Sequence, residues 1–456
     1  MILKRIKAVI CLPMAFFTLV TGLSFVSQTR QEELEAKLAE SIEGDFVPVF
    51  RFAIASDVHI SESDPTTAER FAKLFETAYR YADAHPTYNS LDAVLLAGDN
   101  CNSGSDGEYA ILNAVVAENK REGTEFITIM GNHEFATTGH EGYVRNMGEE
   151  LDKHVVVKGY HIIGLSPDPK DTWHTPGQLI WLNRELSKAA ADDPDKPIFT
   201  MQHGHIWNTV YVSRSWYTQM SLPLHLVYAQ FPQVINFSGH SHGPVNNPLE
   251  IWQNSYTQLG TGTLNYFEME RDIGDNTVPE GSRNAAQYLI VEVDAENRVR
   301  IQPYNILTDD FMKTPSNTDD PDKQLIYQID EPGNTSSYVY TSARKKTATK
   351  PRFDSGAAVS VDSVTADSVT VSFSQALADE CVYGYRVTVT DPAKRGKKVA
   401  EKEIYSEYYF EPMPETLSCT VGGLSAGREY NVTVVPLNVW LQAGDGLTAS
   451  FTTAES

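Results

Sequence analysis

The sequence predicts a layered α/β domain over residues 46–308 and a separate all-β sandwich over residues 357–454. In the first region, short apolar runs rich in β-branched residues alternate with amphipathic helical patterns, which is typical of α/β layers. In the second region, short segments alternate apolar and polar residues, as strands with one buried face do. The length of 456 residues is compatible with this division.

Composition excludes some classes of protein. The net charge of -23 argues against a nucleic-acid-binding surface, which would show clustered basic residues. The acidity serves solubility. The cysteines are too few for a disulfide scaffold. Cys11 lies in the N-terminal segment, Cys101 is interpreted as a structural thiol, and Cys381 and Cys419 are expected on different sheets of the sandwich, both reduced.

The N-terminus has the pattern of a targeting segment. Lys4, Arg5 and Lys7 precede an apolar run at residues 8–26. Residues 1–27 are therefore expected to act as a cleaved signal peptide or as an uncleaved membrane anchor, and either would place the remaining chain outside the cytoplasmic membrane. Residues 28–45 carry apolar positions at helical spacing and are expected to form a spacer helix.

Five apolar runs of the α/β region end in residue types that bind metals or transfer protons. Open α/β sheets place their ligands at the carboxyl ends of strands, so these positions favour a metal site over isolated structural histidines. The runs and the residues that follow them are 50–56 with Asp57 and His59, 93–97 with Asp99, 126–130 with Asn132 and His133, 198–202 with His203 and His205, and 234–238 with His240 and His242.

The intervening segments predict the remaining layers. Residues 70–84 and 108–122 have amphipathic helical patterns. Thr175 is expected to cap a later helix, with Pro176 in its first turn. Residues 256–266 and 287–293 are expected as strands of a second sheet, which residues 299–304 would close.

The order D-x-H, G-D-N, G-N-H-E, H and G-H-x-H resembles the calcineurin-like metallophosphoesterase superfamily over residues 46–308. The segment 175–182 is also similar to the helix of that family that opens with a Gln-Leu-x-Trp-Leu pattern. The resemblance implies a β-sandwich flanked by helices, in α/β/β/α layers, whose strands converge on two metal ions.

The resemblance also implies the ligands. Two divalent ions would be held, of Mn, Fe, Zn, Co or Ni, since oxygen and imidazole ligands suit these metals. His205 remains an alternative to His203, because either residue could end that strand. The implied ligands are Asp57, His59 and His242 for one ion, Asn132, His203 and His240 for the other, and Asp99 as a bridge.

The implied activity is hydrolysis of phosphate mono- or diesters by a hydroxide that bridges the two ions, with His133 as general acid. Asn102 stands where the purple acid phosphatase branch has a tyrosine, which argues against an iron–tyrosinate centre. The alternative is a surface adhesion protein with a vestigial phosphoesterase domain, and the complete ligand set argues against it. Residues 206–231 are rich in aromatics and are either a wall that faces the substrate or a loop packed on the domain.

The C-terminal region resembles another family. Residues 309–356 are polar and are expected to be a linker, with residues 325–328 and 338–340 along a domain surface. Residues 424–430 resemble the turn and tyrosine corner of fibronectin type III domains, an immunoglobulin-like sandwich. Phe373 stands where that family often has Trp. Such a domain is expected to provide cell-surface or carbohydrate contact and to be dispensable for the chemistry, because all implied ligands precede residue 243.

Overall fold

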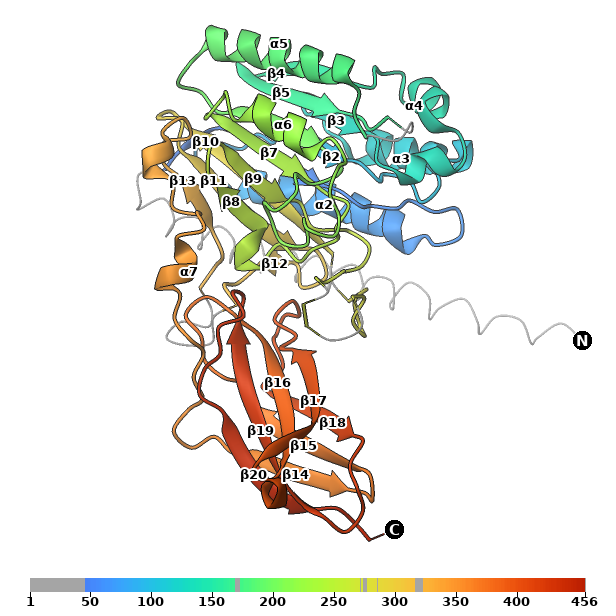
Figure 1. The fold of residues 1–456 in the computed structure, drawn as a ribbon. Helices are drawn as coiled ribbons and strands as arrows, with labels where there is room; N and C mark the ends of the chain where they lie inside the picture. Colours follow the sequence, from blue (N-terminus) through green and yellow to red (C-terminus); the bar gives the residue numbers. More distant parts are fainter. Residues whose placement is uncertain are drawn as a thin grey trace, which may run out of the picture.

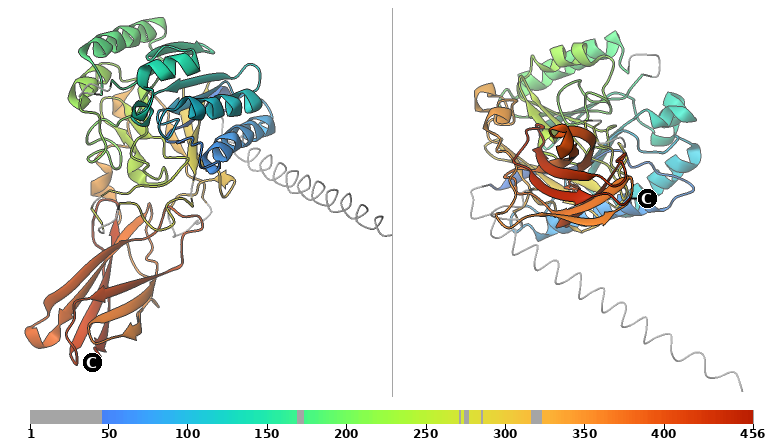
Figure 2. Two further views of the ribbon diagram at one scale, coloured as in Figure 1. Left: turned by 90° about the vertical axis from the view of Figure 1, so that its right-hand side faces the viewer. Right: turned by 60° about the horizontal axis from the view of Figure 1, so that its bottom comes forward.

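The computed structural model describes residues 46–168, 173–270, 272–273, 277–284, 286–315 and 323–455. The expected targeting segment (1–27) and spacer helix (28–45) lie outside these residues. Within the described part of the chain, no helix is both long and apolar enough to cross a bilayer. Figures 1 and 2 show an α/β domain with a β-sandwich attached at one end.

Two sheets form the centre of the α/β domain. The first has the strand order β12-β11-β10-β1-β2-β3, and β13 also pairs with β11. The second has the order β4-β5-β6-β7-β9-β8. The strands of the first sheet are β1 (Pro48–Ala55), β2 (Ala93–Ala97), β3 (Glu125–Ile129), β10 (Gln287–Asp294), β11 (Val299–Asn305), β12 (Asp310–Phe311) and β13 (Tyr327–Ile329). Those of the second are β4 (Lys153–Val157), β5 (Tyr160–Leu165), β6 (Ile198–Gln202), β7 (Val234–Ser238), β8 (Ile251–Gln253) and β9 (Thr257–Gly260).

Helices cover the outer face of each sheet. Helices α2 (Thr66–Ala84), α3 (Asp106–Asn119) and α4 (Gly139–Met147) pack on the first sheet, and α5 (Pro176–Asp192) and α6 (Ser221–Tyr228) on the second. Between the sheets, the Phe52 ring lies 4.9 Å from that of Phe199 and 6.0 Å from that of Phe237. The layers are therefore α/β/β/α, as expected.

Helix α5 begins as the sequence predicts. Thr175 Oγ1 accepts the Gln178 backbone N–H, and the Gln178 side chain accepts the Thr175 N–H, so the two residues form a capping box. Pro176 occupies the first helical position, where its missing N–H is not needed.

The assignment of strands to sheets was wrong for two segments. β10 pairs antiparallel with β1, and β11 pairs with β10, so both belong to the first sheet rather than the second. Of residues 256–266, only β9 is a strand, and it does lie in the second sheet. A strand buried on both faces has a continuous apolar pattern, which does not reveal the sheet it joins.

The C-terminal domain is a sandwich of two sheets. Phe373 is 2% exposed and packs against Tyr385 at 4.7 Å between ring centroids, so it fills the expected core position. Tyr430 Oη accepts the Ser425 N–H at 3.1 Å, which confirms the tyrosine corner. Cys381 and Cys419 are buried and free, as expected. The sheets are β14 (Val359–Val364), β15 (Ser368–Ser374) and β18 (Thr416–Gly422), and β17 (Lys397–Tyr405), β16 (Val382–Asp391), β19 (Glu429–Asn438) and β20 (Leu447–Thr452).

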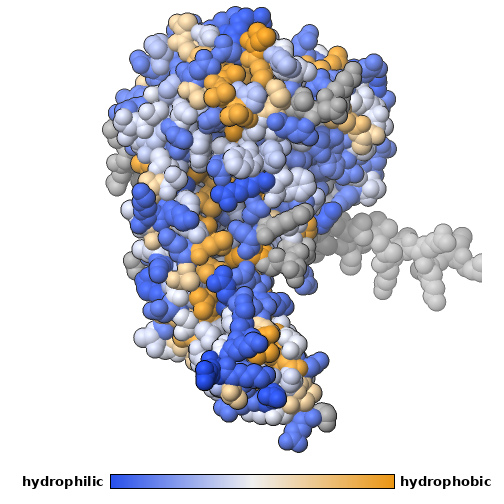
Figure 3. Space-filling model, viewed as in Figure 1, coloured by the Kyte–Doolittle hydropathy of each residue, from blue (hydrophilic) through white to orange (hydrophobic). Residues whose placement is uncertain are grey.

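The segment expected as a linker packs closely on the α/β domain. β13 extends the first sheet, and Tyr340 Oη accepts the Gln328 N–H at 2.9 Å. Arg344, in the short helix α7 (Arg344–Thr347), donates to the carbonyls of Pro248 and Ile251, each at 2.9 Å. Figure 3 shows a largely hydrophilic face, with hydrophobic residues at the junction between the domains. The two domains therefore share a packed boundary rather than a free connection.

Candidate metal centre

The strand ends that the sequence singles out meet at one edge of the domain. β1, β2 and β3 are parallel neighbours in the first sheet, and β6 and β7 are parallel neighbours in the second. Because the carboxyl ends of both sets point the same way, the residues that follow them converge. The centre therefore lies between the two sheets and takes residues from both.

The backbone at this edge is strained. Asp57, His59, Asp99, His240 and His242 all have positive φ, between 49° and 72°. Such a conformation is uncommon outside glycine, although Asp and His adopt it more readily than most residues. Strain of this kind is concentrated at functional sites, where the surrounding structure enforces it.

Two motif glycines permit the close approach of the loops. A Cβ at Gly131 would collide with the Asp99 carboxylate, and one at Gly98 would lie 2.6 Å from His203 Nδ1. Gly98 also has a φ of +92°, which a side chain would disfavour. The glycines of G-D-N and G-N-H-E are thus required by packing against the candidate ligands.

The ligand-type atoms form three overlapping groups. In each group, these atoms all lie within 4.8 Å of one another. The groups are Asp57, His59 and His242; His59, Asp99 and His133; and Asp99, His203 and His240. His242 Nε2 lies 3.2 Å from Asp57 Oδ1, and His203 Nε2 lies 3.2 Å from Asp99 Oδ2. Asp99 belongs to two of the groups, which is the position expected of a bridging ligand.

Hydrogen bonds orient the imidazole rings. His203 Nδ1–H donates to the Ala97 carbonyl at 2.9 Å, and His242 Nδ1–H donates to the Tyr266 carbonyl at 2.8 Å. A carbonyl can only accept, so Nε2 of each ring is the atom turned toward the carboxylates. Metal-binding histidines are commonly held in this way.

The buried polar atoms fit a bound metal ion. Among the described residues, Asn132 Oδ1 and His203 Nε2 are buried and have no hydrogen-bond partner. An unsatisfied buried polar atom is costly, and an ion would satisfy both. An amide oxygen, carboxylates and imidazoles form the mixed oxygen and nitrogen donor set that suits the metals expected from sequence.

The pKa values of the buried Asp and His side chains are shifted by burial and by the charges of their neighbours. Burial raises the pKa of Asp99, but the neighbouring His203, His59 and His133 together outweigh it, and the pKa lies well below its usual range. Burial lowers the pKa of His203, yet Asp99 raises it to about 9. Burial lowers the pKa of His240 to about 3. Metal ligands must be deprotonated, so an ion bound here would need His203 in its neutral form.

His205 lies away from the carboxylates. Its Nδ1 and Nε2 are each 2.6 Å from a serine hydroxyl, those of Ser238 and Ser241. Of the two histidines, His203 is the one whose Nε2 lies beside the Asp99 carboxylate.

His133 lies at the open rim of the centre. It begins the 3-10 helix η1 (His133–Ala136), and its side chain is 40% exposed. Nδ1–H donates to the Asn102 carbonyl at 2.8 Å, while Nε2 lies 3.9 Å from Asp99 Oδ2. The ring is thus anchored at Nδ1 and leaves Nε2 without a strong protein contact beside Asp99.

Two features of the site were not found from sequence. Glu134 is fully buried, and its carboxylate accepts the backbone N–H groups of Cys101 (2.9 Å) and Gly131 (2.7 Å), so it ties two ligand loops together. Its place in G-N-H-E could have suggested a role. Trp216 and Tyr266 flank the centre, with ring centroids 5.0 Å from His240 and 4.3 Å from His242. No local pattern indicates Tyr266, whereas Trp216 belongs to the aromatic segment 206–231 that the sequence singled out as a possible wall.

Residues 206–231, which include α6, contact both the C-terminal domain and the candidate centre. Tyr211 and Val212 are buried against the C-terminal domain, whereas Trp216 stands beside His240. The loop is therefore packed at one point and borders the centre at another.

Comparisons with known proteins agree with this architecture. A family model of calcineurin-like phosphoesterases matches residues 50–244, and one of fibronectin type III domains matches residues 351–450. No curated protein matches the chain.

Several solved structures are similar to parts of the chain. A structure of PhoD is 13% identical, with 57% of this chain and 66% of that chain covered and a TM-score of 0.35. A "Myokine structure" is 21% identical, with 24% of this chain and 98% of that chain covered and a TM-score of 0.18. The FN5 domain of Drosophila Lar is 19% identical, with 24% of this chain and 97% of that chain covered and a TM-score of 0.16. On the two family matches, this chain contains a calcineurin-like phosphoesterase domain and, after it, a fibronectin type III domain.

Proposed function

We propose that the α/β domain hydrolyses phosphate mono- or diesters at the centre between its two sheets. The observation that carries the proposal is the convergence of ligand-type side chains on Asp99, with Asn132 Oδ1 and His203 Nε2 buried and unpartnered. The phosphoesterase family match supports the same class of reaction.

Two divalent ions would be held by the residues that the sequence singled out. Asp57, His59 and His242 would hold one ion, and Asn132, His203 and His240 the other, with Asp99 between them. Such ions, when bound, supply Lewis-acid polarisation of a phosphate and activation of water. They also bring local positive charge to an acidic protein, which favours an anionic substrate.

His133 is proposed as the general acid. Its Nδ1 is engaged with the Asn102 carbonyl, so a proton carried at Nε2 would face the leaving oxygen. His133 is the most exposed member of the three groups, so it can reach a substrate without losing its backbone anchor.

We also propose that the protein works outside the cytoplasmic membrane, free or held by its N-terminus. The basic residues and apolar run at the start of the sequence support this. Cell fractionation should find the mature chain outside the cytosol; recovery of the full chain from the cytosol would overturn the proposal.

Hydrolysis is tested on protein loaded with Mn or Zn, with p-nitrophenyl phosphate as monoester and bis(p-nitrophenyl) phosphate as diester. At least one should be hydrolysed, and Asp99→Asn should abolish the activity. Asp106→Asn is the matched control, since Asp106 is an exposed acid on α3 outside the centre. A fully metal-loaded protein that hydrolyses neither ester would favour a vestigial site in an adhesion protein.

A further inference from the structure

The C-terminal domain packs against the loops that border the metal centre. One cluster of buried apolar side chains spans the two domains. From the α/β domain it takes Tyr211, Val212, Phe267, Met269 and Ile273, and from the C-terminal domain Cys381, Tyr383, Tyr408, Tyr409, Leu437 and Val439. This cluster is separate from the core of the sandwich itself, so its tyrosines serve the junction between the domains.

A chain of hydrogen bonds crosses this junction. The Glu270 N–H donates to Tyr211 Oη at 3.0 Å, and Tyr383 Oη donates to Asp272 Oδ1 at 2.6 Å. The two tyrosine hydroxyls are 2.8 Å apart. Because the Tyr383 proton is given to Asp272, the Tyr211 hydroxyl must donate to Tyr383. Each hydroxyl thus accepts one bond and donates one, which ties the two loops of the α/β domain to β16.

The first of these loops carries Trp216. The Trp216 N–H donates to the Val212 carbonyl at 3.0 Å, directly after Tyr211, and its side chain packs against the same cluster. Ser215 Oγ donates to Glu270 Oε1 at 2.7 Å, which joins this loop to the second one. The Trp216 ring stands edge-on to His240, at an interplanar angle of 86°.

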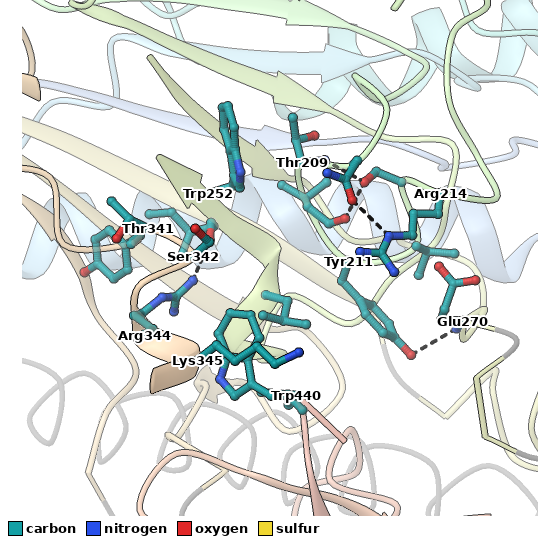
Figure 4. Close-up of a pocket in the computed structure, with 18 of the residues that line it drawn as sticks. Thr209, Tyr211, Arg214, Trp252, Glu270, Thr341, Ser342, Arg344, Lys345 and Trp440 are labelled. Carbon is teal, nitrogen blue, oxygen red and sulfur yellow. Dashed lines mark hydrogen bonds between the residues drawn. The ribbon is translucent and has the colours of Figure 1, made fainter. Parts of the chain in front are cut away.

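The other side of this loop is less supported. A cavity of about 450 Å³ lies between Tyr211 and Arg214 on one side and Lys345 and Trp440 on the other (Figure 4). Figure 4 also shows the bond from Tyr211 to the Glu270 backbone. With open space on the cavity side, the contacts of Tyr211 hold the loop in place.

A second link reaches the segment that follows His242. Asn246 Nδ2 donates to the Tyr408 carbonyl at 2.9 Å, and Asn247 Nδ2 donates to Tyr408 Oη at 2.7 Å. The Tyr405 hydroxyl donates to the Glu270 carbonyl. The C-terminal domain therefore contacts three segments around one side of the centre.

We propose that Tyr383 is a positioning residue of the phosphoesterase site, which acts through Tyr211 to hold Trp216 as the wall beside His240. This inference rests on the proposed function. The wall would contact an apolar or aromatic ester group of the substrate, so Tyr383 would influence substrate binding rather than metal binding. The fibronectin type III domain is then part of the substrate-binding unit.

The test compares two hydroxyl deletions in the full chain. Tyr383→Phe removes the bonds to Tyr211 and Asp272, whereas Tyr430→Phe removes a bond inside the sandwich, the one that its hydroxyl accepts from the Ser425 N–H. The proteins are labelled with 5-fluorotryptophan, and the Trp216 signal is identified by its loss in Trp216→Phe. We expect the ¹⁹F signal of Trp216 to shift or broaden in Tyr383→Phe and to be unchanged in Tyr430→Phe.

Kinetics provide the second measurement. For bis(p-nitrophenyl) phosphate, Tyr383→Phe should raise KM roughly tenfold while metal content stays at the wild-type level, because displacement of a positioning group weakens binding at a distance. In a Trp216→Ala background the same change should have no further effect on KM. An unchanged Trp216 signal, or an equal KM effect with and without Trp216, would overturn the proposal.

The two readouts separate this inference from the proposed function. If the wild-type protein hydrolyses no ester but the Trp216 signal responds to Tyr383→Phe, the positioning role stands and the proposed reaction fails. If Tyr383→Phe does not fold, Tyr211→Phe removes the same bond from the other domain and is judged by the same outcomes.

Discussion

His203 Nε2 and Asp99 Oδ2 lie 3.2 Å apart, although β6 and β2 belong to different sheets. The contact joins the two halves of the candidate centre, because Asp99 also belongs to the group that contains His59 and His133. On the proposed function, loss of the Asp99 carboxylate should therefore affect both of the proposed ions, and loss of His203 mainly one.

Asp99→Ala should remove metal and activity together. The substitution takes away the carboxylate shared by two of the three groups, and it leaves His203 without its charge partner. Elemental analysis of the purified variant should give well under half of the wild-type metal content, whereas Asp106→Ala should match the wild type. Retention of full metal content by Asp99→Ala would show that Asp99 does not bridge.

His133→Asn should retain its metals and lose turnover. A positioned general acid contributes roughly 10²–10⁴-fold in rate. The loss should be smaller for esters with good leaving groups, such as p-nitrophenolate, because these need less protonation. The measurements are metal per chain and kcat across esters of graded leaving-group pKa. Loss of the metals would make His133 a ligand, and a uniform loss across esters would assign it to phosphate positioning.

A chain that ends after Lys350 should be destabilised or insoluble, contrary to the expectation of a dispensable domain. It would uncover Tyr211, Phe267 and Met269, each fully or almost fully buried. Burial of one large apolar side chain contributes about 1.5–3 kcal/mol, so loss of the cover should cost several kcal/mol. Thermal unfolding and soluble yield test this. A soluble truncated chain with the wild-type Tm would show that the domains are independent.

Protonation of His85 should lower the free energy of unfolding in mild acid. Its Nδ1 accepts the Tyr88 N–H at 3.0 Å, and burial, assisted by Arg51, lowers its pKa from 6.5 to about 4. The unfolded chain therefore takes up this proton first. The contribution of neutral His85 to the free energy of unfolding is complete above pH 6.5 and is lost as the pH falls toward 4.

The effect is measured by urea unfolding at pH 7 and pH 5 in the wild type and in His85→Gln, which does not titrate. The difference in unfolding free energy between the two pH values should be smaller in the variant. Equal differences in the two proteins would assign the acid sensitivity to other groups.

Much of the fold and of the candidate site could be predicted because the relevant patterns are local. The strand ends at Asp57, Asp99 and Asn132 follow from apolar runs and from turns at glycine, and the start of α5 follows from Thr175 and Gln178. The clustering of these ends follows from the rule that parallel strands present their ligands at one edge.

Only tertiary contacts distinguish His203 from His205. Both follow β6 and both are buried, so neither spacing nor polarity separates them. Ser238 and Ser241, which come from β7 and its following loop, bind His205 and leave His203 beside Asp99. The assignment of β10 and β11 to the first sheet was decided in the same way, by their pairing with β1.

The sequence alone therefore indicated the two domain families, through motifs that resemble them, and the strand ends with their candidate ligand positions, because short-range periodicity and turn chemistry encode these ends. Only the tertiary structure revealed the contacts of Tyr383 and Tyr408 with the α/β domain. In the sequence they belong to a sandwich strand and a loop, and their contacts with Tyr211 and Asn247 join residues more than 160 positions apart. Contacts between such distant residues depend on how whole sheets pack, which no local pattern records.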